Sequence, residues 1–256
     1  MSLRASVLTF AALALVLFSA HAFSPQPSPL AAAFGQGPAI VLVRGLDSGL
    51  ECWLPTARIL ARRHRVVFVD LPGHGDRAMP EPFSLERSTR ALDVALARAS
   101  REPVVLVGHS LGGLVAAAEA CAHPGRVRAL VLIETALRPQ ARGIGSRAAL
   151  ATDLSSRVAR LQCPLLVVLV PHSWPKGEPW VETAAALGFG AVPRVRAVRV
   201  DSCGHLVMLD RPDGLARLIG RFADAPDGGP VVLIRAVDGL AQPNRALSGG
   251  TMNPPG

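Results

Sequence analysis

Residues 103–114, with the sequence P-V-V-L-V-G-H-S-L-G-G-L, restrict the possible folds of this chain more than any other segment. An apolar run leads into a G-x-S-x-G turn, and the helix formers A-A-A-E-A follow. A strand that turns sharply into a helix can hold a serine in a strained conformation with its hydroxyl exposed, and the glycines leave room for neighbouring backbone. This context predicts that Ser110 lies in a nucleophile elbow.

The composition is compatible with a single domain that buries one sizeable core. The chain has 256 residues, of which 50% are hydrophobic, and this length favours one domain over two. The formal net charge of +8 raises nucleic acid or an anionic membrane as partners. The basic residues are scattered, however, and the chain has no Tyr and only 8 Phe with which to stack bases. We therefore expect no nucleic-acid partner.

The first 22 residues have the organisation of an export signal. Arg4 lies in a short positive region, an apolar run covers residues 7–18, and A-H-A at 20–22 is typical of a cleavage site. An uncleaved anchor is the alternative, because residues 5–22 approach the lower limit of about 17 residues for a spanning helix. We predict cleavage of residues 1–22, export to the periplasm or the medium without stable membrane insertion, and a Pro-rich linker over residues 23–36.

Four cysteines lie beside predicted strands and helices, and their spacing is not that of a metal site. They are Cys52, Cys121, Cys163 and Cys203. An exported protein could pair them in more than one way, and the sequence does not choose among the pairings. Buried free thiols are the interpretation that we prefer. We predict no metal and no cofactor.

Short apolar runs alternate with amphipathic helical stretches, a pattern typical of a parallel sheet covered by helices on both faces. The predicted strands are 39–43, 65–70, 104–107, 127–133, 165–170 and 195–200. The predicted helices are 50–63, 85–99, 111–122, 181–187 and 214–222. We therefore expect an α/β domain over residues 37–222 with a sheet of about six strands. Residues 223–256 would form a disordered tail or add an edge strand around 231–237.

Four motifs in a fixed order resemble the α/β-hydrolase superfamily over about residues 37–222. They are V-L-V-R-G-L at 41–46, V-D-L-P-G-H-G-D-R at 69–77, G-H-S-L-G-G at 108–113, and S-C-G-H at 202–205 followed by D-R-P. The resemblance implies the α/β-hydrolase fold, with the nucleophile on the third motif and its base on the last. Only residues 23–38 precede the first predicted strand, so we expect the two initial antiparallel strands of the family to be missing. Residues 135–162 have room for one or two helices, so we expect a minimal cap.

The proposed nucleophile needs a general base within hydrogen-bond reach, and seven histidines compete for that role. His205 lies on a glycine loop after the last predicted parallel strand, where open α/β sheets gather their functional groups. His109 precedes Ser110, and its side chain should point away from that of the serine. We predict that His205 is the base, with His172 as the runner-up.

The resemblance implies that the backbone N–H groups of Leu46 and Leu111 form the oxyanion hole. The family usually has His-Gly where this chain has Arg44 followed by Gly45, so the loop shape is kept while its first residue differs. Arg44 either orients an anionic substrate or holds the loop. We assign Arg44 and His109 to substrate binding.

The acid that would orient the base does not lie at the position that is usual in the family. In the common family pattern it lies a few residues beyond the strand that corresponds to residues 165–170, and this chain has Ser173 there. Glu178 follows in a Pro-rich loop. Some family members carry the acid at the end of the preceding strand, where this chain has Glu134, and a carboxylate there can orient the imidazole. We predict Glu134, with Glu178 or no acid at all as the alternatives.

Together these residues predict a serine hydrolase that cleaves a small carboxylic ester through an acyl-enzyme. A lactonase or a perhydrolase of the same fold is an alternative activity. A catalytically impaired binding protein is the alternative class, supported by Ser173 at the acid position, by Arg44 and by the missing strands. The intact G-H-S-L-G-G motif and His205 favour catalysis.

Overall fold

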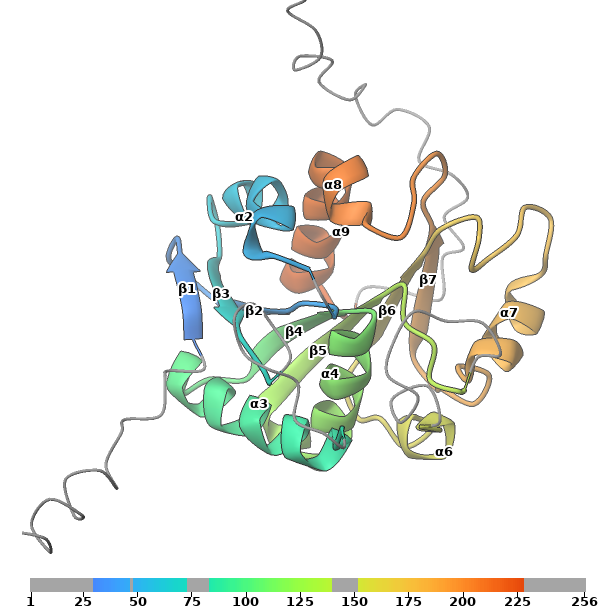
Figure 1. The fold of residues 1–256 in the computed structure, drawn as a ribbon, viewed down its shortest axis with the longest axis horizontal. Helices are drawn as coiled ribbons and strands as arrows, with labels where there is room; N and C mark the ends of the chain where they lie inside the picture. The colour runs from blue at the N-terminus through green and yellow to red at the C-terminus, as the bar shows by residue number, and fades with distance from the viewer. Residues whose placement is uncertain (1–29, 47, 73–82, 140–151, 228–256) are drawn as a thin grey trace, which may run out of the picture.

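The computed structural model describes residues 30–46, 48–72, 83–139 and 152–227 (Figure 1). The predicted signal segment, the first part of the linker and the possible strand around 231–237 lie outside the described residues. Among the helices that are described, none combines the length and the apolar character needed to cross a bilayer.

Seven strands form one sheet in the order β1-β3-β2-β4-β5-β6-β7. They are β1 (Leu30–Phe34), β2 (Ala39–Val43), β3 (Arg65–Val69), β4 (Val104–His109), β5 (Val127–Ile133), β6 (Leu165–Leu169) and β7 (Val195–Arg199). Strands β2 to β7 pair in parallel. The predicted α/β class and the six predicted strands are confirmed, with small differences at the strand ends.

Strand β1 lies where the sequence predicts a linker, and the expectation that the antiparallel strands are both missing is wrong. β1 pairs antiparallel with β3, so that the sheet has seven strands instead of six. Its sequence, L-A-A-A-F, has weak strand propensity, because alanine is depleted in strands. The exposed edge of β3 supplies the pairing partner, and the Phe34 ring packs edge-on against Phe68 with centroids 6.1 Å apart. Tertiary pairing thus decides the conformation of this segment.

Helices cover both faces of the sheet (Figure 1). One face packs against α3 (Leu85–Ala99), α4 (Leu111–Ala122), α6 (Ser155–Val158) and α7 (Trp180–Leu187). The other packs against α2 (Leu54–Leu60), α8 (Val207–Asp210) and α9 (Pro212–Asp224). The helix predicted over 50–63 is a short 3-10 helix, Leu50–Cys52, followed by α2. A second 3-10 helix, Pro124–Arg126, follows α4.

The sheet separates two clusters of buried apolar side chains, because successive side chains of a strand point to opposite faces. In β2, Val41 and Val43 belong to the cluster on the α4 side, and Ile40 and Leu42 belong to the cluster on the α9 side. Both faces of the central strands are buried, which explains their continuous apolar runs. The parallel arrangement brings the carboxyl ends of β2 and β4 to β7 to one edge of the sheet.

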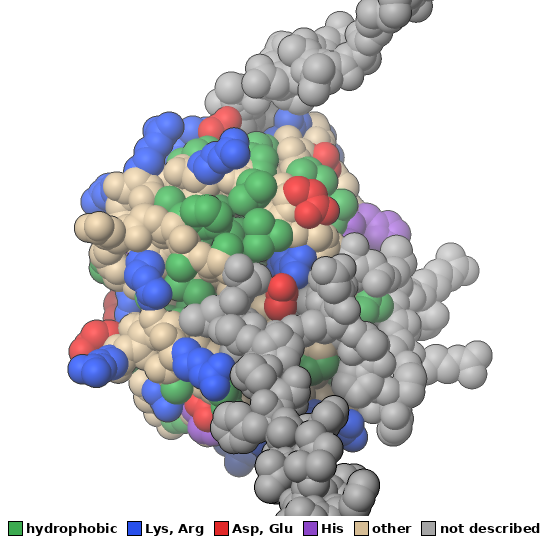
Figure 2. All heavy atoms as spheres, turned by 60° about the vertical axis from the view of Figure 1, so that its left-hand side comes forward, with side chains coloured by type: hydrophobic (Ala, Val, Ile, Leu, Met, Phe, Trp, Pro, Cys, Tyr) green, Lys and Arg blue, Asp and Glu red, His purple; other side chains and the backbone are tan. Residues whose placement is uncertain are grey.

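Figure 2 shows one face of the molecule, on which Lys and Arg side chains are distributed among acidic and apolar groups. The described part of this face has no continuous basic area. This distribution agrees with the scattered arginines of the sequence.

Candidate active site

Ser110 lies at the sharp turn between β4 and α4, where the sequence predicts an elbow. Its backbone has φ 52° and ψ −121°, a conformation that non-glycine residues seldom adopt. The Ser110 N–H donates to the carbonyl of Ile133 at 3.0 Å, and the Ser110 carbonyl accepts from the N–H of Gly113 at 3.0 Å. The serine side chain does not cap α4 and is partly exposed. Ser110 therefore has the strained, accessible geometry of a nucleophile elbow.

Two glycines allow other segments to approach this elbow. A Cβ atom at Gly112 would overlap the carbonyl oxygen of Arg44, and one at Gly113 would overlap the Thr135 hydroxyl. That hydroxyl donates to the carbonyl of Ser110 at 3.3 Å. Larger side chains at either glycine would therefore displace the segments that surround the serine.

His205 and Glu134 meet at the edge of the sheet, although they are 71 positions apart in the sequence. Nδ1 of His205 lies 3.2 Å from Oε2 of Glu134. The Glu134 side chain is 3% exposed, whereas that of His205 is 46% exposed. A carboxylate on Nδ1 orients the ring and leaves Nε2 as the nitrogen that can exchange a proton with a substrate or a nucleophile. The structure thus places the predicted base and the predicted acid together.

The Glu134 carboxylate accepts three hydrogen bonds. Oε1 accepts from the Val170 N–H at 2.8 Å, and Oε2 accepts from Ser173 Oγ at 3.0 Å as well as from His205. These donors offset the cost of burying a charged group and keep the carboxylate in one orientation. Ser173 occupies the usual acid position of the family and here supplies a hydroxyl to the acid of the preceding strand. This role of Ser173 is not evident from the sequence, in which a polar residue at the family's acid position is the signal for it.

Glu178 and His172, the alternatives for acid and base, lie elsewhere. Oε1 of Glu178 accepts from Thr183 Oγ1 at 2.6 Å, which ties the loop to α7. The Glu178 carbonyl also accepts from Trp174 Nε1 at 2.9 Å. His172 is exposed on the loop that follows β6. Of the two candidate acids, Glu134 is therefore the one that contacts His205.

His109 is buried against the loop that carries His205. It is 2% exposed, its Nε2 donates to the His205 carbonyl at 3.0 Å, and the two rings lie 4.6 Å apart. Burial and the nearby His205 lower the pKa of His109 to about 3, so this imidazole is neutral near pH 7. The buried ring of His109 therefore contacts the loop that carries His205, and substrate binding by His109 stays a prediction.

Arg44 is also buried and holds the loop that follows β2. Its guanidinium forms an ion pair with Asp70 and donates to the carbonyl of Ser48 at 2.7 Å. Ser48 Oγ in turn donates to the Gly45 carbonyl at 2.9 Å. Arg44 is 2% exposed, so a substrate anion would have little access to its guanidinium. These contacts favour the alternative in which Arg44 fixes the loop, and substrate binding by Arg44 stays a prediction.

Leu46 and Leu111, the predicted oxyanion donors, lie on two segments that flank the elbow. Leu111 is the first residue of α4, where N–H groups have no acceptor within the helix. Leu46 lies on the loop held by Arg44, and this loop approaches the serine closely. A Cβ atom added at Gly45 would lie 3.2 Å from the Ser110 Cβ. Both segments therefore lie close to the Ser110 side chain, and an oxyanion-hole role for the two N–H groups stays a prediction.

The four cysteines are free thiols, and each is half-buried. Burial raises the pKa of Cys163 to about 12 and that of Cys203 to about 11. Thiols with such pKa values are protonated near pH 7 and are poor nucleophiles. Ser110 is therefore a better candidate nucleophile than either cysteine.

The sheet order and the helices on both faces are those of the α/β-hydrolase fold. The sequence profile of the Alpha/beta hydrolase family matches residues 40–154, and this match supports membership of the α/β-hydrolase superfamily. Pimeloyl-(acyl-carrier protein) methyl ester esterase of Pseudoalteromonas atlantica is 40% identical over 103 residues, which are 40% of this chain and 38% of that protein. RutD of Escherichia coli O157:H7, named as a carbamate hydrolase, is 35% identical over 117 residues, which are 45% of this chain and 42% of that protein. The matches span about two-fifths of both relatives.

Solved structures share the fold over most of the chain. A membrane phospholipase A described as a bacterial virulence factor has a TM-score of 0.63 and 21% identity, and the match covers 89% of this chain and 99% of that one. The enol-lactonase of Burkholderia xenovorans LB400 has a TM-score of 0.61 and 22% identity, with 75% and 94% covered. At these identities the similarity shows the fold alone.

Proposed function

We propose that this protein is a serine hydrolase that cleaves carboxylic esters of small molecules through an acyl-enzyme intermediate. The observation that carries this proposal is the contact between His205 Nδ1 and the buried Glu134 carboxylate, at the sheet edge where Ser110 is held in a strained turn. A nucleophile, a base and an orienting acid on neighbouring strand ends are the components of acyl transfer. The similarity to a methyl ester esterase supports an ester as the substrate.

In the proposed reaction, Ser110 Oγ attacks the ester carbonyl while His205 Nε2 takes the serine proton. Glu134 stabilises the imidazolium, and the N–H groups of Leu46 and Leu111 donate to the oxyanion. The tetrahedral intermediate collapses when the C–O bond to the alcohol breaks, and His205 returns its proton to the leaving oxygen. Water then attacks the acyl-enzyme with His205 as base, which releases the carboxylic acid and restores Ser110.

Three features of the sequence favour a catalytically impaired binding protein, and the structure gives each of them another explanation. The Glu134 carboxylate is a candidate for the acid that position 173 lacks, and Glu134 and Ser173 belong to one hydrogen-bond network. Arg44 replaces the usual histidine with a buried ion pair that holds the loop. β1 provides one of the antiparallel strands that are expected from the sequence to be missing.

A lactonase or perhydrolase activity would use the same nucleophile and base.

A fluorophosphonate probe tests the nucleophile directly. Such a probe phosphonylates an activated serine, so we expect one modified residue, Ser110, when the labelled protein is digested and its peptides are sequenced by mass spectrometry. Heat-unfolded protein is the control, because an unactivated serine should not react. Labelling of another residue, or equal labelling of folded and unfolded protein, would contradict the proposed function.

We also propose that the protein is exported and processed. The positive, apolar and A-H-A segments of residues 1–22 support this proposal. N-terminal sequencing of protein from the periplasm or medium of its native host should find Phe23 as the first residue. Intact Met1 or Ser2 in a membrane fraction would instead favour an uncleaved anchor.

A further inference from the structure

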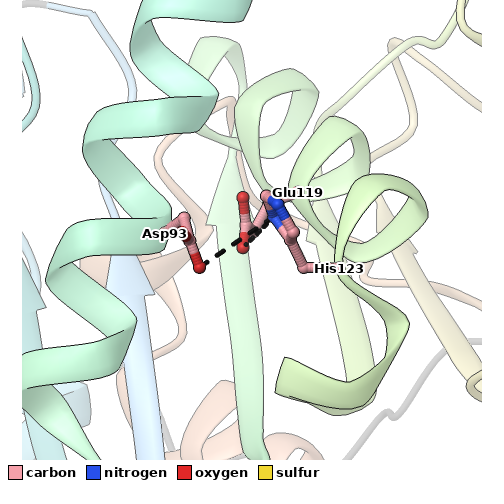
Figure 3. A group of neighbouring side chains, drawn as sticks. All are labelled: Asp93, Glu119 and His123. Atoms are coloured by element: carbon pink, nitrogen blue, oxygen red, sulfur yellow. Dashed lines mark hydrogen bonds and ion pairs between the residues drawn. The ribbon is translucent and has the colours of Figure 1, made fainter.

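Asp93, Glu119 and His123 converge where α3 packs against the end of α4, at the opposite end of that helix from Ser110 (Figure 3). One potential ligand atom from each of the three lies within 4.8 Å of the other two. Nδ1 of His123 lies 3.0 Å from Oε1 of Glu119 and 4.0 Å from Oδ1 of Asp93. The sequence leads us to expect no metal site, and these three residues, which come from α3 and from the end of α4, follow no ligand-spacing motif.

One oxygen of the Glu119 carboxylate is available to bind a cation. Its side chain is fully buried, and its Oε2 has no hydrogen-bond partner among the described residues. Burying a charged carboxylate without a partner for each oxygen costs free energy, because the charged form loses its hydration. Buried carboxylate oxygens nearly always have a partner, so an unsatisfied one requires an explanation. A cation bound beside Glu119 would offset the cost of desolvation.

We propose that Asp93, Glu119 and His123 bind one divalent transition-metal ion of the zinc type. One imidazole nitrogen and two carboxylate oxygens match the ligand preference of Zn²⁺, whereas Mg²⁺ prefers oxygen ligands and retains several waters. Tetrahedral ligands around Zn²⁺ lie about 3.4 Å apart, so the cluster needs only small side-chain adjustments. The Asp93 and His123 side chains are 30% and 43% exposed, which gives an ion access and leaves room for water as the fourth ligand.

Arg126 is the competing cation at this site. Its Nε lies 3.4 Å from Asp93 Oδ1, and its side chain is 42% exposed. The guanidinium can therefore turn into solvent when a metal ion binds. The carboxyl end of α4 also favours a cation, because unpaired carbonyl groups make this end of a helix negative. A bound ion would join α4, whose first turn follows Ser110, to α3.

The test uses the full chain, treated with EDTA and then dialysed. Isothermal titration with ZnCl₂ should show one ion bound per chain, and Zn²⁺ should raise the melting temperature more than equimolar MgCl₂ does. Asp93→Asn and His123→Gln should each weaken zinc binding about tenfold or more and remove most of the zinc-induced shift. Glu119 is not substituted, because a change at a fully buried position could prevent folding.

The variant Arg126→Gln distinguishes a specific metal site from nonspecific zinc binding to surface groups. Removing the competing guanidinium should tighten zinc binding, whereas His172→Gln, at an exposed histidine far from the cluster in the sequence, should leave it unchanged. The proposal is overturned if zinc does not change the melting temperature of the parent protein. It is also overturned if Asp93→Asn and His123→Gln both bind zinc as tightly as the parent does.

Discussion

Ser110→Ala should reduce kcat for a short aryl ester by about 10⁴-fold or more, because the acyl-enzyme can no longer form. The hydroxyl is the only group removed, and the Cβ that fits the strained turn remains. We therefore expect the melting temperature to stay within a few degrees of that of the parent protein. The measurement is kcat and KM with purified protein, together with a thermal unfolding curve.

Ser100→Ala provides a matched control for this variant. Ser100 ends α3 and precedes β4, so it lies at the opposite end of that strand from Ser110. The control should keep the full kcat. If purified Ser110→Ala keeps the activity of the parent, Ser110 is not the nucleophile and the proposed function is wrong.

Glu134→Gln should lower kcat by about 10²-fold to 10⁴-fold while KM changes little. The substituted amide keeps the size of the side chain, but it removes the charge that stabilises the imidazolium of His205. It can also present an N–H group to Nδ1, which favours the wrong tautomer of the ring. The measurement is kcat and KM on one activated ester and one alkyl ester.

Two further variants make this prediction specific. Glu178→Gln should keep nearly the full kcat, because Glu178 contacts Thr183 and not His205. Adding Ser173→Asp to Glu134→Gln should restore part of kcat, since Ser173 Oγ lies 3.0 Å from the carboxylate oxygen that contacts His205. If Glu134→Gln has the same kcat as the parent, Glu134 is not the acid. A selective loss in Glu178→Gln would place the acid on the loop after β6.

Local sequence carries enough information for most of the sheet. Strands β2 to β7 are runs of Val, Leu and Ile that are buried on both faces, and such runs are recognisable without knowledge of their partners. The turn at Ser110 is equally local, because the apolar strand, the glycines and the alanine-rich helix follow one another directly. β1 differs, since the segment L-A-A-A-F becomes a strand only through its pairing with β3.

The sequence by itself determined the fold class, the elbow at Ser110 and the selection of His205 and Glu134 as candidates, because residue type and position along the chain are sufficient for these inferences. Tertiary structure decided which acid contacts His205, since Glu134 and Glu178 are both close to predicted strand ends. It also decided that Arg44 and His109 are buried, that Ser173 supports the acid, and that Asp93 faces Glu119 and His123. Each of these features arises from contacts between segments that are far apart in the sequence. A single sequence gives neither the distances between such segments nor the burial of their side chains.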